Sequence, residues 1–280
     1  MEKNNMKTPL TYYGGKQTLA PLIISLIPED HILYGEPFTG GGAVFFHKMP
    51  SRSEVINDTN GELMNFYRVV RDSFRPLQKM IQRTLHCRNA YRQATVVYQN
   101  PDLFDEVRRA WAVWVVCSQG FAGKMDGPFG YDKSCNTTSK RIANKRLNFT
   151  EAYAKRLEHA QIECADALYI IRSRDHEGAF FYCDPPYVGS NCGHYKGYTE
   201  ADYEALLGLL SGIKGRFLLS SYPGPQLDRY VTEKGWYQIR KELLVTVNSK
   251  SGKQKSKTEV LTANYPIGNG ITTEQKEPAI

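Results

Sequence analysis

Long apolar runs are missing from this chain of 280 residues: no stretch approaches the roughly 20 residues that a membrane-spanning helix requires. Residues 1–7 contain no apolar core of the kind found in a signal peptide. Six cysteines are spread through the chain without a C-x-x-C pair, and we interpret them as reduced core residues. These absences predict a cytoplasmic protein without a membrane partner, a disulfide framework or a metal ion.

Two common phosphate-binding patterns are also absent. The chain contains neither G-x-G-x-x-G nor G-K-[ST], so a pyrophosphate dinucleotide or a triphosphate is disfavoured as a ligand. We find no internal repeat. The content of 41% hydrophobic and 23% charged residues predicts a globular protein with a sizeable core, in one domain or two.

Positive charge is distributed unevenly. The net charge is +7, yet residues 68–150 hold 15 Lys and Arg against 6 Asp and Glu, which leaves the rest of the chain slightly negative. A basic segment within a nearly neutral body favours a polyanion-binding region. A solvated helical surface explains the same charge equally well.

Strand and helix patterns alternate at both ends of the chain but not in its middle. Residues 74–120 are predicted to be helical, with a helix starting at Asn100-Pro101, and residues 121–148 are predicted to be loops. The flanking elements predict a parallel α/β body interrupted by a helical, basic insertion. The expected strands are 32–34, 53–56, 162–164, 179–183, 217–221, 242–247 and 259–263, with helices over 15–26, after Asp58-Thr59-Asn60 and after Thr199-Glu200.

The most informative motif is Asp184-Pro185-Pro186-Tyr187, which directly follows the apolar run 179–183. The prolines fix φ and donate no N–H, so the carbonyls around them stay outside a sheet ladder. A carboxylate, free carbonyls and a flat ring on such a platform suit the binding of an amino group on a planar base. An ordinary strand-to-turn exit would explain these four residues equally well. The other motifs of the chain must decide between the two interpretations.

A glycine-rich segment, Glu36-Pro37-Phe38-Thr39-Gly40-Gly41-Gly42, follows the first clear strand. Glycines allow close approach of a ligand to the backbone, although a structural turn explains them as well. Asp58, after the second strand, suits a ribose diol or a helix cap. The order of the two features favours a small ligand of the adenosine type.

The ordered motifs resemble those of the Dam-type DNA adenine methyltransferases over nearly the whole chain. The segments that carry the resemblance are Tyr12-Tyr13-Gly14-Gly15-Lys16, Pro37-Phe38-Thr39-Gly40-Gly41-Gly42, Asn57-Asp58-Thr59-Asn60, Asp184-Pro185-Pro186-Tyr187, Tyr198-Thr199-Glu200-Ala201-Asp202, Leu219-Ser220-Ser221-Tyr222 and Glu259-Val260-Leu261-Thr262-Ala263-Asn264-Tyr265. The resemblance implies an α/β fold with a Rossmann-like sheet that binds S-adenosylmethionine. Residues 1–70 and 151–280 would form this catalytic domain, and residues 71–150 a helical target-recognition insertion.

By resemblance, the glycine-rich segment lines the methionine part of the cofactor, Asp58 holds the ribose hydroxyls and Asp166 lies near the adenine amine. A helix cap explains Asp166 as well, and a structural ion pair is the alternative for Lys16. The implied cofactor-binding residues are Tyr12, Lys16, Phe38, Thr39, Gly40, Gly42, Asp58 and Asp166.

The resemblance implies a catalytic set of Asp184, Pro185, Pro186 and Tyr187. Asp184 and the Pro185 carbonyl would accept hydrogen bonds from the target amino group, while Tyr187 stacks on a base flipped out of the duplex. The amine itself attacks, so no covalent intermediate is required, and Cys183 is interpreted as a core residue.

The insertion matches the target-recognition region of this family in position. Residues 119–131 are expected to form a base-contacting or intercalating loop, whereas Trp111 and Trp114 are expected in the core. A solvated loop is the alternative for the second basic stretch, 250–257. The expected phosphate-contacting residues are Lys124, Lys133, Lys140, Arg141, Lys145, Arg146, Lys253 and Lys255.

The function expected is site-specific methylation of the adenine amino group in double-stranded DNA, by a protein encoded in a bacterium or phage. Methylation of the cytosine amino group and a catalytically silent DNA-binding specificity module remain as alternatives. Methylation of RNA or of protein glutamine is less well supported, because the basic insertion fits a duplex. A cognate restriction endonuclease is a possible partner.

Overall fold

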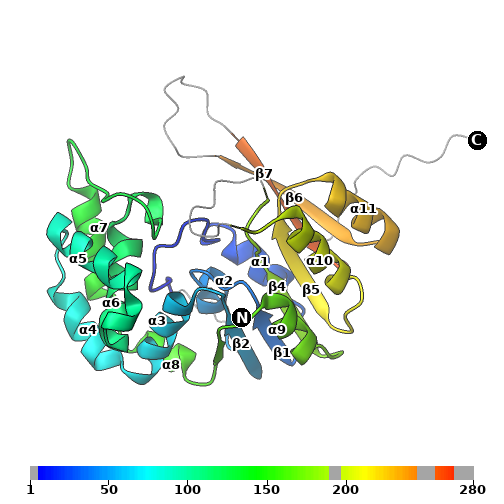
Figure 1. The fold of residues 1–280 in the computed structure, drawn as a ribbon. Coiled ribbons are helices and arrows are strands. Elements are labelled where there is room, and N and C mark those ends of the chain that lie inside the picture. The colour runs from blue at the N-terminus through cyan, green and yellow to red at the C-terminus, as the bar shows by residue number, and fades with distance from the viewer. Residues whose placement is uncertain (1–5, 189–196, 245–255, 268–280) are drawn as a thin grey trace, which may run out of the picture.

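Seven strands form one mixed sheet in the computed structural model, which describes residues 6–188, 197–244 and 256–267. Their spatial order is β3-β2-β1-β4-β5-β7-β6 (Figure 1). Neighbours among β1 to β5 run parallel, whereas β7 is antiparallel to β5 and β6. The strands are β1 (Leu33–Glu36), β2 (Ser53–Asn57), β3 (Gln161–Glu163), β4 (Ala179–Cys183), β5 (Arg216–Ser221), β6 (Tyr237–Leu244) and β7 (Ser256–Ala263). The predicted Rossmann-like α/β sheet is thereby confirmed.

Helices bury both faces of this sheet. Because neighbours along a strand point to opposite faces, Phe180 packs with one group of helices and Phe181 with the other. All of β4 is buried, Cys183 included, as expected for a central parallel strand. One face carries α1 (Ala20–Leu26), α2 (Ala43–His47) and α3 (Gly61–Asp72), and the other carries α9 (Ala167–Arg174), α10 (Glu200–Leu210) and α11 (Pro225–Lys234).

The strand order reverses between β1 and β4, which pair side by side with Gly35 opposite Phe181. The chain leaves β1 towards α2 on one face and leaves β4 towards α10 on the other. A crevice at the carboxyl ends of two such strands is the usual ligand site of open α/β sheets. The glycine-rich segment and Asp184 both start at this edge.

A cluster of helices lies to one side of the sheet (Figure 1). Its central helix is α6, in which every residue from position 110 to 119 is buried. Trp111 and Trp114 are 6% and 0% exposed, which confirms their predicted place in the core. The buried core runs without interruption from α6 through α3 to the sheet. The helices here are α4 (Phe74–Arg83), α5 (Arg88–Gln99), α6 (Glu106–Gln119) and α7 (Thr137–Leu147), with α8 (Ala152–Leu157) leading back to β3.

Three predictions of helix extent are wrong. The predicted loop 121–148 contains α7, which buries only Thr138 and Ile142 and therefore shows no clear apolar period. At Asn100-Pro101 the chain forms only a short 3-10 helix, η1 (Pro101–Leu103). The longer helix begins at Glu106, where Asp105 caps it by accepting a hydrogen bond from the Arg108 N–H at 2.9 Å. Likewise α1 begins at Ala20 and not at residue 15, since a turn precedes it.

Cysteines occupy more exposed positions than expected. The five cysteines in the described ranges are free thiols, and Cys117 and Cys183 are buried as predicted. The core prediction is wrong for the three others, which lie at the ends of elements where side chains reach solvent. These exposed cysteines are Cys87, Cys135 and Cys164. Of the helices that the structure describes, none has the length and apolar character needed to cross a membrane.

The two antiparallel strands at the edge confirm the predicted C-terminal hairpin, although β6 begins at Tyr237, five residues before the expected start. Lys253 and Lys255 lie outside the described residues. After β7 the chain returns to the first helix, where the Tyr265 hydroxyl donates to the Leu26 carbonyl at 2.8 Å. Residues 239 positions apart are thus joined by this hydrogen bond.

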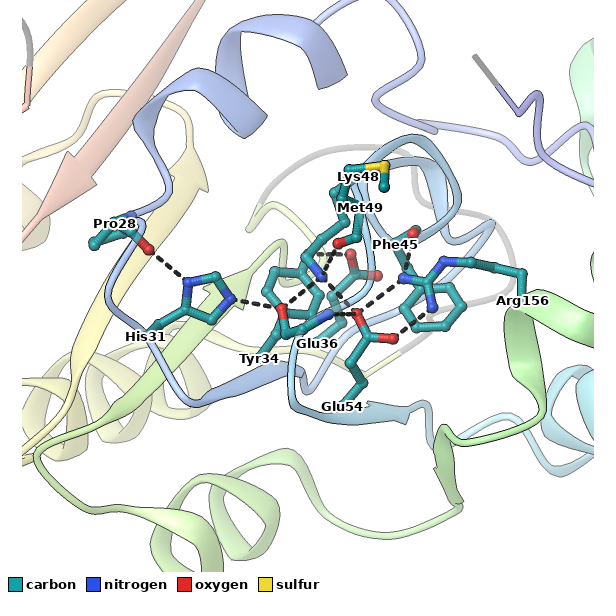
Figure 2. A network of polar contacts seen from close by, with 10 residues as sticks. Pro28, His31, Tyr34, Glu36, Phe45, Lys48, Met49, Glu54 and Arg156 are labelled. Atoms are coloured by element: carbon teal, nitrogen blue, oxygen red, sulfur yellow. Dashed lines mark hydrogen bonds and ion pairs between the residues drawn. The ribbon is translucent and has the colours of Figure 1, made fainter. Parts of the chain in front are cut away.

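A buried ionic network lies next to Tyr34 and Glu36 of β1 (Figure 2). The Glu54 carboxylate of β2 accepts hydrogen bonds from Lys48 Nζ at 2.5 Å and from Arg156 Nη1 and Nη2 at 2.5 and 2.9 Å. Arg156 also donates to the Phe45 carbonyl at 2.8 Å. The three charged side chains are at most 7% exposed. The network fastens α2, β2 and α8 to one another.

Glu36, at the end of β1, lies beside this network and accepts a hydrogen bond from the Tyr34 hydroxyl. Burial raises the pKa of Glu36 to about 7, against an ordinary value of 4.5. The folded protein therefore keeps a proton that the unfolded chain loses near pH 4.5. This contribution to stability is complete below that pH and is lost as the pH rises through 7.

We therefore expect the free energy of unfolding to fall by about 2 kcal/mol between pH 5.5 and 7.5 through Glu36 alone. Glu36→Gln, which cannot ionise, should remove this part of the pH dependence. Urea unfolding of both proteins at the two pH values measures the difference. An equal slope in wild type and variant would show that Glu36 does not titrate in this window.

Candidate active site

Four segments that are distant in sequence meet at the carboxyl edge of the sheet. They are the glycine-rich segment after β1, Asp58 after β2, the Asp184-Pro185-Pro186-Tyr187 motif after β4, and the N-terminal segment around Tyr12 and Lys16. Pro185 is buried and Pro186 half-buried. The structure thus brings together the proposed catalytic motif and most of the residues expected to bind the cofactor.

Asp184 forms an ion pair with Lys16, which stands 168 residues earlier in the sequence. Lys16 Nζ lies 2.8 Å from Asp184 Oδ1, and the Tyr187 hydroxyl donates to the same oxygen at 3.2 Å. Within the described part of the chain, both contacts of this carboxylate therefore fall on Oδ1. Burial raises the pKa of Asp184, and the charge of Lys16 opposes this shift. The arrangement leaves Oδ2 as an acceptor for a ligand.

Glu259 is a second carboxylate in this cluster, and the sequence did not identify it as a site residue. It lies on β7, is 6% exposed, and places Oε1 3.2 Å from Lys16 Nζ and 2.5 Å from the Tyr187 hydroxyl. Burial alone would lower the pKa of Lys16, but Asp184 and Glu259 outweigh it and raise that pKa. The available sequence signal was its place in the segment Glu259-Val260-Leu261-Thr262-Ala263-Asn264-Tyr265, one of those that carry the resemblance.

The Tyr187 ring is fixed on several sides. Its centroid lies 4.4 Å from that of Tyr222, with the two planes at 62°. Lys16 Nζ lies 4.9 Å from the Tyr187 centroid. An oriented ring next to a carboxylate can stack on a planar ligand whose amino group reaches Asp184.

Close packing explains the glycines of the segment after β1. Gly40 and Gly42 have φ of +49° and +65°, a region that other residues adopt only with strain. A Cβ at Gly41 would lie 2.6 Å from the Tyr12 Cβ, and one at Gly40 would lie 3.0 Å from the Tyr12 ring. Tyr12 therefore covers this segment, as the resemblance implies.

Asp58 ties the glycine-rich segment to the start of α3. Its carboxylate accepts hydrogen bonds from the Gly40 N–H at 3.0 Å and the Asn60 N–H at 2.9 Å. The N-cap of α3 is Asn60 rather than Asp58. The Thr39 side chain is buried and bonds internally, donating to the Glu36 carbonyl at 2.9 Å. Both residues thus shape the segment, and Asp58 also presents a buried charge there.

Two aromatic side chains meet between the glycine-rich segment and α10. The rings of Phe38 and Tyr198 meet edge to face at 6.4 Å. The Tyr198 hydroxyl is buried and has no hydrogen-bond partner within residues 6–188, 197–244 and 256–267. Asp166 is exposed and caps α9 by accepting from the Tyr169 N–H at 2.9 Å, so the cap proposed as its alternative role is present.

The residues expected to contact phosphate fall into two groups. Lys133, Lys140 and Arg141 are exposed, the last two on α7. Lys124, Lys145 and Arg146 have partners within the protein. Lys124 lies over the Tyr13 ring at 4.7 Å, Lys145 donates to the Thr11 hydroxyl, and Arg146 Nη2 donates to the Gln82 carbonyl at 2.7 Å. Burial lowers the pKa of Lys145 to about 8.

The loop over residues 119–131 is braced and presents an aromatic side chain to solvent. Gly120 pairs with Phe129, and the Phe121 N–H donates to the Pro128 carbonyl at 2.8 Å. Phe129 stacks on the His86 ring at 4.8 Å, whereas Phe121 is 61% exposed. Ala122 has φ +57°, an uncommon value for alanine, so the chain turns sharply beside the exposed ring.

Comparison with known proteins gives a consistent result. The model of the family described as D12 class N6 adenine-specific DNA methyltransferase matches residues 12–214. The chain is 27% identical over 290 residues to Type II methyltransferase M1.LlaDCHI of Lactococcus lactis subsp. cremoris, covering 95% of this chain and 98% of the relative. It is 28% identical over 228 residues to Type II methyltransferase M.MjaIII of Methanocaldococcus jannaschii, covering 71% and 75%. With the DNA N-6-adenine-methyltransferase of Escherichia phage P1 it shares 29% over 200 residues, covering 68% of this chain and 25% of the relative.

Proposed function

The chain belongs to the family of D12 class N6 adenine-specific DNA methyltransferases, and from this premise we propose that it moves a methyl group from S-adenosylmethionine to the amino group of adenine in duplex DNA. The observation that carries the proposal is the Asp184 carboxylate, held on Oδ1 by Lys16 and Tyr187 beside a glycine-rich segment. S-adenosylmethionine supplies the methyl group on a positively charged sulfur.

The residues after β1 and β2 fit this cofactor. Gly40 and Gly41 leave no room for a Cβ because Tyr12 packs directly on them, so Tyr12 and this stretch of backbone together form the surface offered to the ligand. The buried Asp58 carboxylate suits ribose hydroxyls, and the buried hydroxyl of Tyr198 is a donor for the same ligand. We assign cofactor binding to the expected set, with Tyr198 in addition.

In the proposed reaction, Asp184 and the Pro185 carbonyl each accept one hydrogen of the adenine amino group. The nitrogen lone pair then points away from both acceptors and towards the methyl donor. The Asp184 carboxylate stabilises the positive charge that develops on this nitrogen and is a suitable acceptor for the proton that leaves. Tyr187 stacks on the base, and Pro186 keeps the motif rigid.

We assign DNA binding to the helical segment 71–150. A base inside a duplex cannot reach Asp184, so the target adenine must be flipped out of the stack. The exposed side chains of Lys133, Lys140 and Arg141 support phosphate contacts, and the exposed Phe121 supports contact with bases. Lys253 and Lys255 are assigned to DNA binding only because they are positively charged.

Transfer of labelled methyl from S-adenosylmethionine to unmethylated duplex DNA, followed by nucleoside analysis, tests the proposal. N6-methyladenine is the expected product. Methylcytosine would contradict the base assignment, and cofactor binding without transfer to any DNA would favour a silent DNA-binding module. Competition with RNA and protein checks the substrate class.

Neutralising α7 should weaken DNA binding and reduce its salt dependence. For Lys140→Gln with Arg141→Gln, we expect the slope of log Kd against log salt to fall by about 2, since each lost phosphate contact releases about one counterion fewer. Titration of labelled duplex at several salt concentrations measures this slope.

The matched control replaces two exposed lysines, Lys214 and Lys234, by glutamine. Lys214 lies before β5 and Lys234 ends α11, so both lie at the amino edge of the sheet, opposite the candidate site. The control removes the same charge and should leave the slope unchanged. A slope that changes equally in both variants would show that net charge, and not α7, governs binding.

A further inference from the structure

Glu259 lies outside the segment 12–214 that the family model matches, yet it contacts two residues of the candidate site. We propose that Glu259 is a positioning residue for methyl transfer: it fixes Lys16 and Tyr187 and keeps Lys16 from fully neutralising Asp184. This inference rests on the proposed function and assigns a role to a residue of the C-terminal hairpin.

The sheet itself determines where Glu259 lies. Val260, its neighbour on β7, pairs with Ser221 of β5 and packs on the face that carries α10. Alternation along the strand directs Glu259 to the opposite face, the one from which Lys16 approaches. With a side chain 8% exposed, Glu259 competes with little solvent for its two partners.

The first consequence concerns charge. One lysine lies between two carboxylates, 2.8 Å from Asp184 and 3.2 Å from Glu259, so the three side chains carry a net charge of −1. Without Glu259, Lys16 and Asp184 would form a neutral pair. A net negative cluster stabilises the positive charge that arises on the attacking nitrogen, and a neutral pair does so less.

The second consequence concerns the aromatic ring. The Tyr187 hydroxyl lies 2.5 Å from Glu259 but 3.2 Å from Asp184, so Glu259 is its closer acceptor. The single phenol hydrogen is shared between the two carboxylates, and these contacts, together with the edge contact to Tyr222, fix the ring plane. A stacking ring held in one orientation places the base for attack.

Glu259→Gln tests the role because it keeps the shape of the side chain and removes its charge. We expect kcat to fall about 10²-fold, with the KM for DNA and the thermal midpoint nearly unchanged. Glu242→Gln is the matched control, since Glu242 lies exposed on β6 of the same hairpin, and it should retain activity. A kcat within threefold of wild type, or an equal fall in both variants, would overturn the proposal.

Tyr187→Phe separates positioning from a general effect on folding. It removes the hydroxyl contacts to Glu259 and to Asp184 without altering charge. We expect a lower kcat, with the double variant falling by less than the product of the two single effects, because the Glu259 contact is shared by both variants. Should Glu259→Gln fail to fold, the Tyr187→Phe variant alone decides, and an unchanged kcat would then contradict the proposal.

A binding measurement tests Glu259 independently of activity. S-adenosylhomocysteine lacks the methyl group and the positive charge of S-adenosylmethionine, so a net negative site prefers the latter. Calorimetry should show that Glu259→Gln lowers this preference several-fold, and an unchanged ratio of the two Kd values would contradict the charge argument. If wild type methylates no DNA, the proposed function fails, while this ratio still tests the role of Glu259.

Discussion

Asp184→Ala is expected to lower the rate of methyl transfer about 10³-fold, the size of effect seen when one preorganised polar group is removed from a reacting centre. The carboxylate is the acceptor that orients the amino group and the anion that opposes the charge developing on it. Lys16 keeps a carboxylate partner in the variant because Glu259 lies 3.2 Å from its Nζ. The site should therefore stay assembled, and cofactor binding should be largely retained.

Single-turnover methylation of duplex DNA, with calorimetric titration of the cofactor, distinguishes lost chemistry from lost binding. Asp228→Ala is the control, since Asp228 is exposed on α11, which packs on the opposite face of the sheet from α1. Full activity of Asp184→Ala would refute its assigned role. A parallel loss of cofactor affinity would instead place Asp184 in the cofactor site.

The second large effect concerns stability. Glu54→Gln is expected to lower the free energy of unfolding by about 3–5 kcal/mol, because it leaves Lys48 and Arg156 buried without their shared anion. Burial would raise the pKa of Glu54, but the hydrogen bond from Arg156 and the charge of Lys48 outweigh it and lower that pKa. The ionic form is thus the one that the fold requires.

Asp72→Asn provides the comparison. Asp72 also accepts two hydrogen bonds from one arginine, Arg71, but its side chain is 57% exposed. The expected cost is below about 1 kcal/mol, since solvent screens such pairs. Urea unfolding measures both variants, and equal losses would show that burial of the Glu54 network contributes little.

Much of the fold could be predicted because buried strands leave a clear sequence pattern. The run Ala179–Cys183 is apolar throughout and ends at a carboxylate and two prolines, and β4 has these bounds. Helix α7 could not be predicted, because it buries only Thr138 and Ile142 against its neighbours. Its boundaries are set by tertiary contacts and not by periodicity.

The residues of the candidate site also differ in whether the sequence alone could identify them. Residues that stand in compact motifs, such as Asp184 and Gly40, could be identified because their chemistry and order are visible locally. Glu259 also stands in a segment that carries the resemblance, but its role could not be identified, because that role depends on the sheet register that brings β7 beside Lys16. Lys145 was expected on the DNA-facing surface, but its bond to Thr11 became visible only in three dimensions.

The contacts of Lys16 with Glu259 and of Leu26 with Tyr265 have a consequence for the timing of synthesis. A ribosome releases the N-terminal residues first, so β7 emerges after every other segment of the site. A nascent chain can carry the glycine-rich segment and the Asp184 motif and still lack the carboxylate that holds Lys16 and Tyr187. Methylating activity is therefore expected to begin only after β7 has emerged and paired with β5.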